Sequence, residues 1–177
     1  MQSGHITQQS IFLKDAPPMM RNTFLTRRAL VISALFLPLA KTQAANTPSL
    51  VEVWKTSSCG CCHNWVAHLN ANGFEVKTND ISESAKAAKR LGLGMPLKFA
   101  SCHTAVIQGY VLEGHVPASE IRRLLSERPL ALGLAVPGMP IGSPGMDGPA
   151  YGGRKDAYAV LLVQREGTST VFQDHRR

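Results

Sequence analysis

The segment Ser58-Cys59-Gly60-Cys61-Cys62-His63 holds three of the four cysteines of the chain. It follows an apolar run that starts at Leu50 and has the pattern of a buried strand. It precedes apolar residues at helical spacing, which are Cys62, Trp65, Val66 and Leu69. The three cysteines are therefore predicted to lie where a strand turns into a helix N-terminus. Unpaired N–H groups and the helix dipole lower the pKa of a thiol there, which favours the thiolate.

The start of the chain has the features of an export signal. Arg27-Arg28 is followed by an apolar run over 29–40 and then by small residues, which is the order of regions in a secretory signal peptide. The apolar run is shorter than the roughly 20 residues of a membrane-spanning helix. We predict a signal peptide over 1–44, for which Met20 is a more usual start, and a single domain over 45–177. An uncleaved anchor and a twin-arginine export route are the alternatives.

The charge of the chain does not indicate a nucleic-acid partner. The formal net charge is +7, but five of the 19 Lys and Arg residues and one of the 12 acidic residues lie in the predicted leader. The remaining domain has a net charge of +3, with scattered charges, no basic stripe and no interleaved aromatic residues. Nucleic-acid-binding proteins usually show such a stripe.

The rest of the domain alternates between strand and helix patterns. In chain order we expect a strand over 50–55, a helix over 61–72, a strand over 74–78, a helix over 83–91, a hairpin of 101–107 and 110–116, and a helix opened by Pro117. Residues 129–156 hold so many prolines and glycines that neither helix nor sheet is expected there. A hairpin of 158–164 and 170–173 closes the chain. The predicted fold class is α/β, with a β-α-β-α-β-β-α core, a Pro/Gly/Met-rich loop and a C-terminal hairpin.

This order of elements, with cysteines at the first strand-to-helix junction, resembles the thioredoxin/glutaredoxin fold over residues 50–128. In that fold, the segment entering the third core strand lies against the active-site cysteines. Ser101-Cys102-His103 holds that position here, without the proline that is usual beside it. The resemblance implies that Cys102 lies next to the first three cysteines, although forty positions separate it from Cys62.

The cysteines support more than one chemistry. Cys59 and Cys62 have the spacing of dithiol oxidoreductases, in which the first thiol attacks and the second resolves the mixed disulfide. Cys61 and Cys102 are surplus to that reaction, whereas Cu(I) gains from all four because thiolates bind it well and bridge neighbouring ions. Structural zinc usually takes two separated cysteine pairs, and Fe–S clusters are uncommon in exported chains. Structural disulfides between clustered cysteines would close almost no loop.

Four longer motifs are similar to those of one family. They are Cys-Gly-Cys-Cys (59–62), Ser-Cys-His-Thr-Ala (101–105), Glu-Gly-His-Val-Pro (113–117) and Val-Pro-Gly-Met-Pro-Ile-Gly-Ser-Pro-Gly-Met (136–146). Over nearly all of 50–173, the chain resembles the periplasmic metal-binding family that includes the copper-resistance protein CopG. The resemblance implies a periplasmic, thioredoxin-like protein of copper tolerance, with Cu(I)/Cu(II) conversion as a further activity and copper exporters or oxidases as partners. It implies that Cys59, Cys61, Cys62 and Cys102 hold copper as a multinuclear Cu(I) thiolate cluster.

Other side chains are weaker candidates for the same site. His103 adjoins Cys102 and either is a ligand or tunes one; the alternative is a capped or solvated histidine at a strand end. Met139 and Met146 could offer thioethers to Cu(I) from a loop over the site, or could simply pack there. For His115 we expect a hydrogen bond to a loop backbone. The alternative function is a thiol–disulfide oxidoreductase with Cys59 and Cys62 as its catalytic residues.

Overall fold

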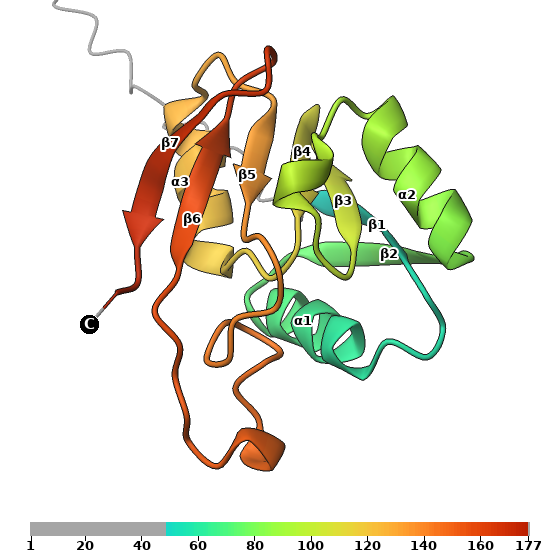
Figure 1. The fold of residues 1–177 in the computed structure, drawn as a ribbon, viewed down its shortest axis with the longest axis vertical. Coiled ribbons are helices and arrows are strands. Elements are labelled where there is room, and N and C mark those ends of the chain that lie inside the picture. Colours follow the sequence, from blue (N-terminus) through green and yellow to red (C-terminus); the bar gives the residue numbers. More distant parts are fainter. Residues whose placement is uncertain (1–48, 177) are drawn as a thin grey trace, which may run out of the picture. The chain divides into compact units, whose positions relative to one another are not determined.

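The computed structural model describes residues 49–176, which form a seven-stranded sheet in the order β2-β1-β3-β4-β5-β6-β7 (Figure 1). The predicted signal peptide over 1–44 lies outside the described residues. The elements are β1 (Leu50–Lys55), α1 (Gly60–Ala71), β2 (Glu75–Asp80), α2 (Glu83–Gly92), η1 (Leu97–Phe99), β3 (Thr104–Ile107), β4 (Tyr110–Glu113), α3 (Ala118–Glu127), β5 (Gly133–Ala135), η2 (Pro149–Tyr151), β6 (Ala159–Val163) and β7 (Ser169–Asp174).

The first seven elements other than η1 follow the predicted order. β1 and β2 are parallel and are connected through α1, while β3 runs antiparallel to both β1 and β4. The turn between β3 and β4 places Gln108 at φ 46° and Gly109 at φ 85°, as a two-residue hairpin turn with left-handed central residues requires. The α/β class is confirmed, and the thioredoxin-like description of the core stays a prediction.

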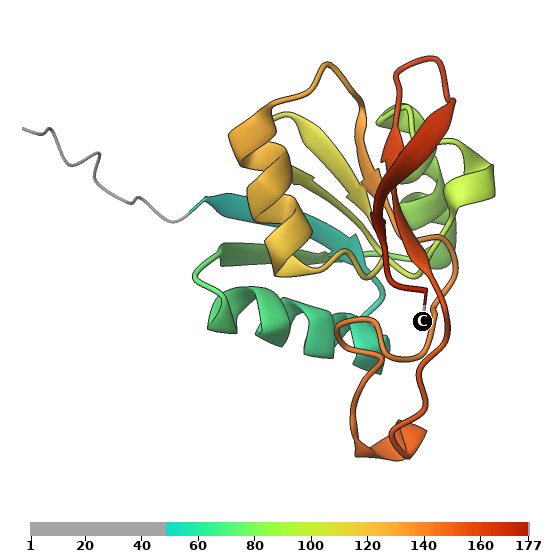
Figure 2. The same ribbon diagram turned by 90° about the vertical axis from the view of Figure 1, so that its left-hand side faces the viewer.

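The helices cover both faces of the sheet. In Figure 2, α1 and α3 lie on one face, and α2 lies on the other. Trp65 and Leu69 of α1 and Ile121 and Leu124 of α3 are fully buried in the larger apolar core on their face. A smaller cluster around Met95 packs on the other face. No helix within residues 49–176 combines the length and the apolar character that a bilayer crossing requires.

The expectation that residues 129–156 contain no strand is wrong. β5 lies within this range and pairs in parallel with β4 and antiparallel with β6. The apolar run before Pro137 is buried between these two strands. Its strand conformation depends on hydrogen bonds to β4 and β6, which the short run itself does not predict. Gly133 is needed here because a Cβ at this position would overlap the carbonyl oxygen of Val111. β5 joins the C-terminal hairpin of β6 and β7, which was predicted, to the rest of the sheet.

Candidate thiol and metal site

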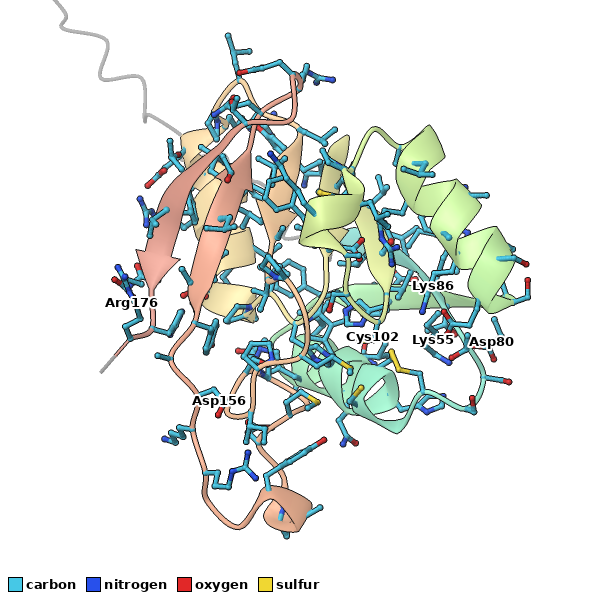
Figure 3. All side chains as sticks on the ribbon, in the orientation of Figure 1. Lys55, Asp80, Lys86, Cys102, Asp156 and Arg176 are labelled. Carbon is cyan, nitrogen blue, oxygen red and sulfur yellow. A yellow bond between two sulfur atoms is a disulfide. The ribbon has the colours of Figure 1, made fainter. Side chains whose placement is uncertain are left out.

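The four cysteines come together at the N-terminal end of α1. Their sulfur atoms all lie within 4.8 Å of one another. The Sγ of Cys61 is 3.6 Å from the Sγ of Cys59 and 3.9 Å from the Sγ of Cys102. Figure 3 shows Cys102 beside the first turn of α1, reached from the segment before β3. The predicted approach of Cys102 to the other three cysteines is confirmed.

Two of the four cysteines are oxidised. Cys59 and Cys62 form a disulfide, whereas Cys61 and Cys102 are free thiols. The pairing matches the C-x-x-C spacing. It leaves the thiols of Cys61 and Cys102 available to bind a metal ion without prior reduction. Coordination by all four sulfur atoms therefore requires that this disulfide first be reduced to two thiols.

The first turn of α1 fixes three of the sulfur atoms locally. Cys59 is the N-cap residue, and its Sγ accepts a hydrogen bond from the backbone N–H of Cys62 at 3.3 Å. This contact satisfies one of the N–H groups that a helix start leaves unpaired. The Pro/Gly/Met-rich loop packs onto the same turn at Gly145, where a Cβ would lie 2.6 Å from the carbonyl oxygen of Cys61. Only glycine at φ +86° permits this approach.

Buried charged side chains fix the segment that carries Cys102. Glu113 of β4 accepts hydrogen bonds from the backbone N–H of Ser101 at 2.6 Å, from the Thr104 hydroxyl at 2.6 Å and from Arg90 Nε at 2.8 Å. Burial raises the pKa of Glu113, and the donors Thr104, Arg90 and Ser101 oppose that shift. Because three donors converge on one carboxylate, the ends of the segment are held to both β4 and α2.

A lysine completes the support of this segment. Lys86 of α2 is almost fully buried, and its Nζ donates a hydrogen bond to the carbonyl oxygen of Cys102 at 2.9 Å. The same ammonium lies 2.9 Å from the carboxylate of Glu83, which faces solvent. The backbone of Cys102 is therefore fixed independently of any ligand on its sulfur atom.

Two buried histidines face the sulfur of Cys102. It lies 3.2 Å from Nδ1 of His103 and 2.9 Å from Nε2 of His115, and the three residues form a second group whose ligand atoms lie within 4.8 Å. His115 Nδ1 lies 2.8 Å from the carbonyl oxygen of Pro144. A carbonyl only accepts, so Nδ1 carries the proton and Nε2 presents its lone pair to the sulfur. The expected backbone hydrogen bond of His115 is confirmed.

Burial keeps these histidines neutral and the thiol protonated. Desolvation lowers the pKa of His103 and His115, and the nearby His115 lowers the pKa of His103 further. Burial also raises the pKa of Cys102 to about 12, with the nearby Cys61 adding to the shift. A metal ion that binds Cys102 must therefore displace a proton. His103 Nε2 is the buried side-chain nitrogen without a hydrogen-bond partner within residues 49–176.

The other sulfur and imidazole side chains near the cysteines differ in exposure and in hydrogen-bond partner. Met139 is 53% exposed and lines a cavity that also contains Cys102. Met146 is buried in the loop, where its sulfur accepts a hydrogen bond from the Tyr151 hydroxyl at 3.2 Å. His63 follows Cys62, but its ring accepts a hydrogen bond from Lys55 at 2.9 Å. Ligation by either methionine stays a prediction.

The contact between His115 and Cys102 was missed by the sequence analysis. The register of the hairpin could have revealed it. With Gln108 and Gly109 as the turn, Thr104 pairs with Glu113, and continuing the same register brings position 102 opposite position 115. The histidine after the second strand was therefore predictable as a neighbour of Cys102 from the turn alone.

Comparison with solved structures identifies a family for this arrangement. The chain is similar to two solved structures of a copper resistance protein, CopG, named Form 1 and Form 2, at 43% and 44% sequence identity with TM-scores of 0.67 and 0.65. The matches cover 73% and 72% of this chain and 99% and 98% of the solved chains. The chain belongs to the CopG family. Because almost the whole length of the solved CopG chains is matched, the likeness includes both segments that supply the sulfur atoms.

The chain was also compared with protein-family profiles and with curated proteins. The profile of a family described as "Protein of unknown function, DUF411" matches residues 99–146. This range includes Cys102, His103 and His115 and ends at Met146, so it spans the hairpin side of the CopG-family site but not the cysteines of α1. The comparison with curated proteins finds no match. The donor set of four sulfur and two neutral imidazole groups suits a soft metal ion.

Proposed function

We propose that this member of the CopG family is a copper-binding protein of copper resistance, and that its cargo is Cu(I) held by the thiolates of Cys59, Cys61, Cys62 and Cys102. One observation supports the proposal most directly. The four sulfur atoms come from two separate segments, and they all lie within 4.8 Å of one another. Cu(I) prefers thiolates, and each thiolate can bridge two ions, so such a cluster suits several copper ions better than one. The name of the solved relatives agrees with this role.

His103 and His115 extend the proposed ligand set. Both imidazoles are buried and neutral, and both approach the sulfur of Cys102, so a copper ion on that sulfur would find nitrogen ligands at the same place. The hydrogen bond from His115 Nδ1 to the carbonyl oxygen of Pro144 orients the ring. Histidines that bind a metal through one ring nitrogen usually make such a hydrogen bond with the other. Met146 would be an additional thioether ligand, and Met139, whose side chain faces solvent, would bind copper only transiently.

The disulfide couples copper binding to oxidation state. With Cys59 and Cys62 joined, the site offers two thiols, and reduction by two electrons and two protons restores four. Two Cu(I) ions could supply those electrons and become Cu(II), which is the Cu(I)/Cu(II) conversion that we propose as a second activity. The signal-like leader supports a periplasmic location, where copper exporters or copper oxidases would be the partners.

Anaerobic copper loading tests the main proposal. The reduced protein should bind more than one copper ion per chain by elemental analysis and show Cu(I)–thiolate absorption in the ultraviolet. Cys102→Ser should lower the copper content, and His63→Gln should not, because His63 pairs with Lys55 instead. Binding of one ion or none, unchanged by Cys102→Ser, would reject the proposal. Competition with Zn(II) tests the preference for copper.

A thiol–disulfide oxidoreductase is the second candidate, because Cys59 and Cys62 form a disulfide at a helix N-terminus. This function predicts reduction of an insulin disulfide by the reduced protein. Cys59→Ser should abolish that activity, and Cys61→Ser should leave it unchanged, since Cys61 takes no part in the dithiol reaction. Loss of activity in both variants would favour the copper cluster over a simple dithiol enzyme.

A further inference from the structure

A cavity of about 430 Å³ opens beside the cluster on the side of Cys102. Its wall includes Lys86 of α2, Ala100 and Cys102 of the segment before β3, and Met139 of the Pro/Gly/Met-rich loop. A volume of this size is within the range of small-molecule sites and is far larger than one metal ion needs. The cavity can therefore admit a metal ion together with a small ligand that carries it.

The cavity has a soft ligand at its wall that the cluster does not require. Met139 is 53% exposed, and its thioether is a ligand for Cu(I). Cys102, which lines the same cavity, is less exposed than Met139 and also contacts Cys61. A soft ion coming from solvent would meet the exposed thioether first and the thiol second.

The backbone holds these two ligands at a fixed spacing. Gly138, next to Met139, donates its N–H to the carbonyl oxygen of Ala100 at 3.0 Å and forms a β-bridge with Ser101. The carbonyl of Cys102 is bound in turn by Lys86. Because both backbones are tied together, the flexible side chain of Met139 is the part that can move between solvent and the thiol.

We propose that this cavity is the port through which Cu(I) enters and leaves the cluster, with Met139 as a transient ligand and Cys102 as the first thiolate. The transfer is a ligand exchange without electron transfer. The bond between Cu(I) and the Met139 sulfur breaks as the bond to the Cys102 sulfur forms, and the proton of the thiol leaves to solvent. This inference rests on the proposed copper-binding function and goes beyond it by separating the exchange route from the storage site.

Exchange kinetics test the port. Reduced protein loaded with Cu(I) is mixed with excess bicinchoninate, and the coloured chelator complex is followed with time; loading from Cu(I) in acetonitrile gives the reverse rate. Met139→Leu should slow both directions about tenfold, which corresponds to ~1.4 kcal/mol at the exchange step. Copper content and equilibrium affinity should stay unchanged, because a transient ligand alters the barrier and not the end states. Leu97→Ala, which removes an apolar side chain that is 66% exposed on neighbouring η1, should exchange at the wild-type rate.

A second variant tests the cavity itself. Ala100→Leu places a larger side chain in the wall and should slow extraction by bicinchoninate while the copper content persists. Wild-type rates in both Met139→Leu and Ala100→Leu would overturn the port. A lower copper content or affinity in Met139→Leu would also overturn it, because Met139 would then be a permanent ligand. If the wild-type protein bound no Cu(I), the failure would lie in the proposed function instead.

Discussion

The first turn of α1 and the segment that enters β3 supply sulfur atoms to the same cluster, yet different interactions hold them. The turn of α1 is organised by neighbours in sequence, through the N-cap contact of Cys59 and its disulfide with Cys62. The segment of Cys102 is organised by α2 and β4, through Lys86 and Glu113. The comparison separates a local support, which a short motif can encode, from a long-range support, which exists only in the folded domain.

The largest expected effect concerns the long-range support. Glu113→Gln removes the charge that compensates Arg90, whose side chain is 6% exposed, and weakens the hold on Ser101 and Thr104. An uncompensated buried charge typically costs ~3–5 kcal/mol. We expect the free energy of unfolding of the reduced, copper-free protein, measured in urea, to fall by about this amount, and the copper content to fall with it.

Glu83→Gln is the matched control for this prediction. Glu83 also pairs with a cation of α2, but its side chain is 73% exposed, so the variant should lose less than about 1 kcal/mol. Similar losses in both variants would mean that the segment of Cys102 does not depend on the buried carboxylate. The distinction between the two supports would then be lost.

The second prediction concerns the pH dependence of stability, which we expect to come from the buried histidines around Cys102 and not from the first turn of α1. His103 and His115 beside Cys102 have a pKa lowered below 6.5 by burial. Above pH 6.5 both histidines are neutral in the folded and the unfolded chain, so neither lowers the free energy of unfolding. Below it the unfolded chain takes up protons that the folded site refuses, so stability falls by up to ~1.4 kcal/mol per pH unit for each histidine. Unfolding in urea at pH 7.5 and 5.5 should differ by roughly 2–3 kcal/mol.

Two variants test the origin of that pH dependence. His115→Gln should reduce the pH dependence of the unfolding free energy of the copper-free protein by about half. The control His63→Gln removes a histidine from an exposed position on α1, and a decrease as large as that in His115→Gln would contradict the assignment to the buried pair. His68, whose pKa is also lowered by burial, is retained in both variants and cancels from the comparison. An equal pH dependence in wild type and His115→Gln would show that the buried pair is not its source.

The same division explains how far the sequence predicts the structure. The start of α1, its end near residue 72 and the two-residue turn between β3 and β4 follow from local patterns, and all three are observed. β5 was not predicted, because three residues gain strand geometry only from β4 and β6 on either side. The approach of Cys102 to the cluster was predictable only through a fold resemblance.

The charged side chains around Cys102 lay beyond local reasoning. Arg90 and Lys86 read as ordinary residues of a polar helix, and the partners that bury them lie on other elements or in the segment before β3. No periodicity distinguishes such residues from solvated ones, because long cationic side chains are usually exposed. The contact of His115 is the intermediate case, since a hairpin register extends local information across two strands.

The smallest predicted effect isolates the local support. In Cys59→Ser and Cys59→Ala the disulfide is absent, and the two variants differ in the side-chain acceptor for the N–H of Cys62. Serine is a good N-cap residue and alanine is a poor one, so the serine variant should be more stable by about 1 kcal/mol in urea unfolding. Equal stability would mean that tertiary contacts, such as the packing of Gly145 on Cys61, hold the first turn of α1. Both regions would then depend on long-range contacts, because a helix start that needs no cap must take its stability from the loop that covers it.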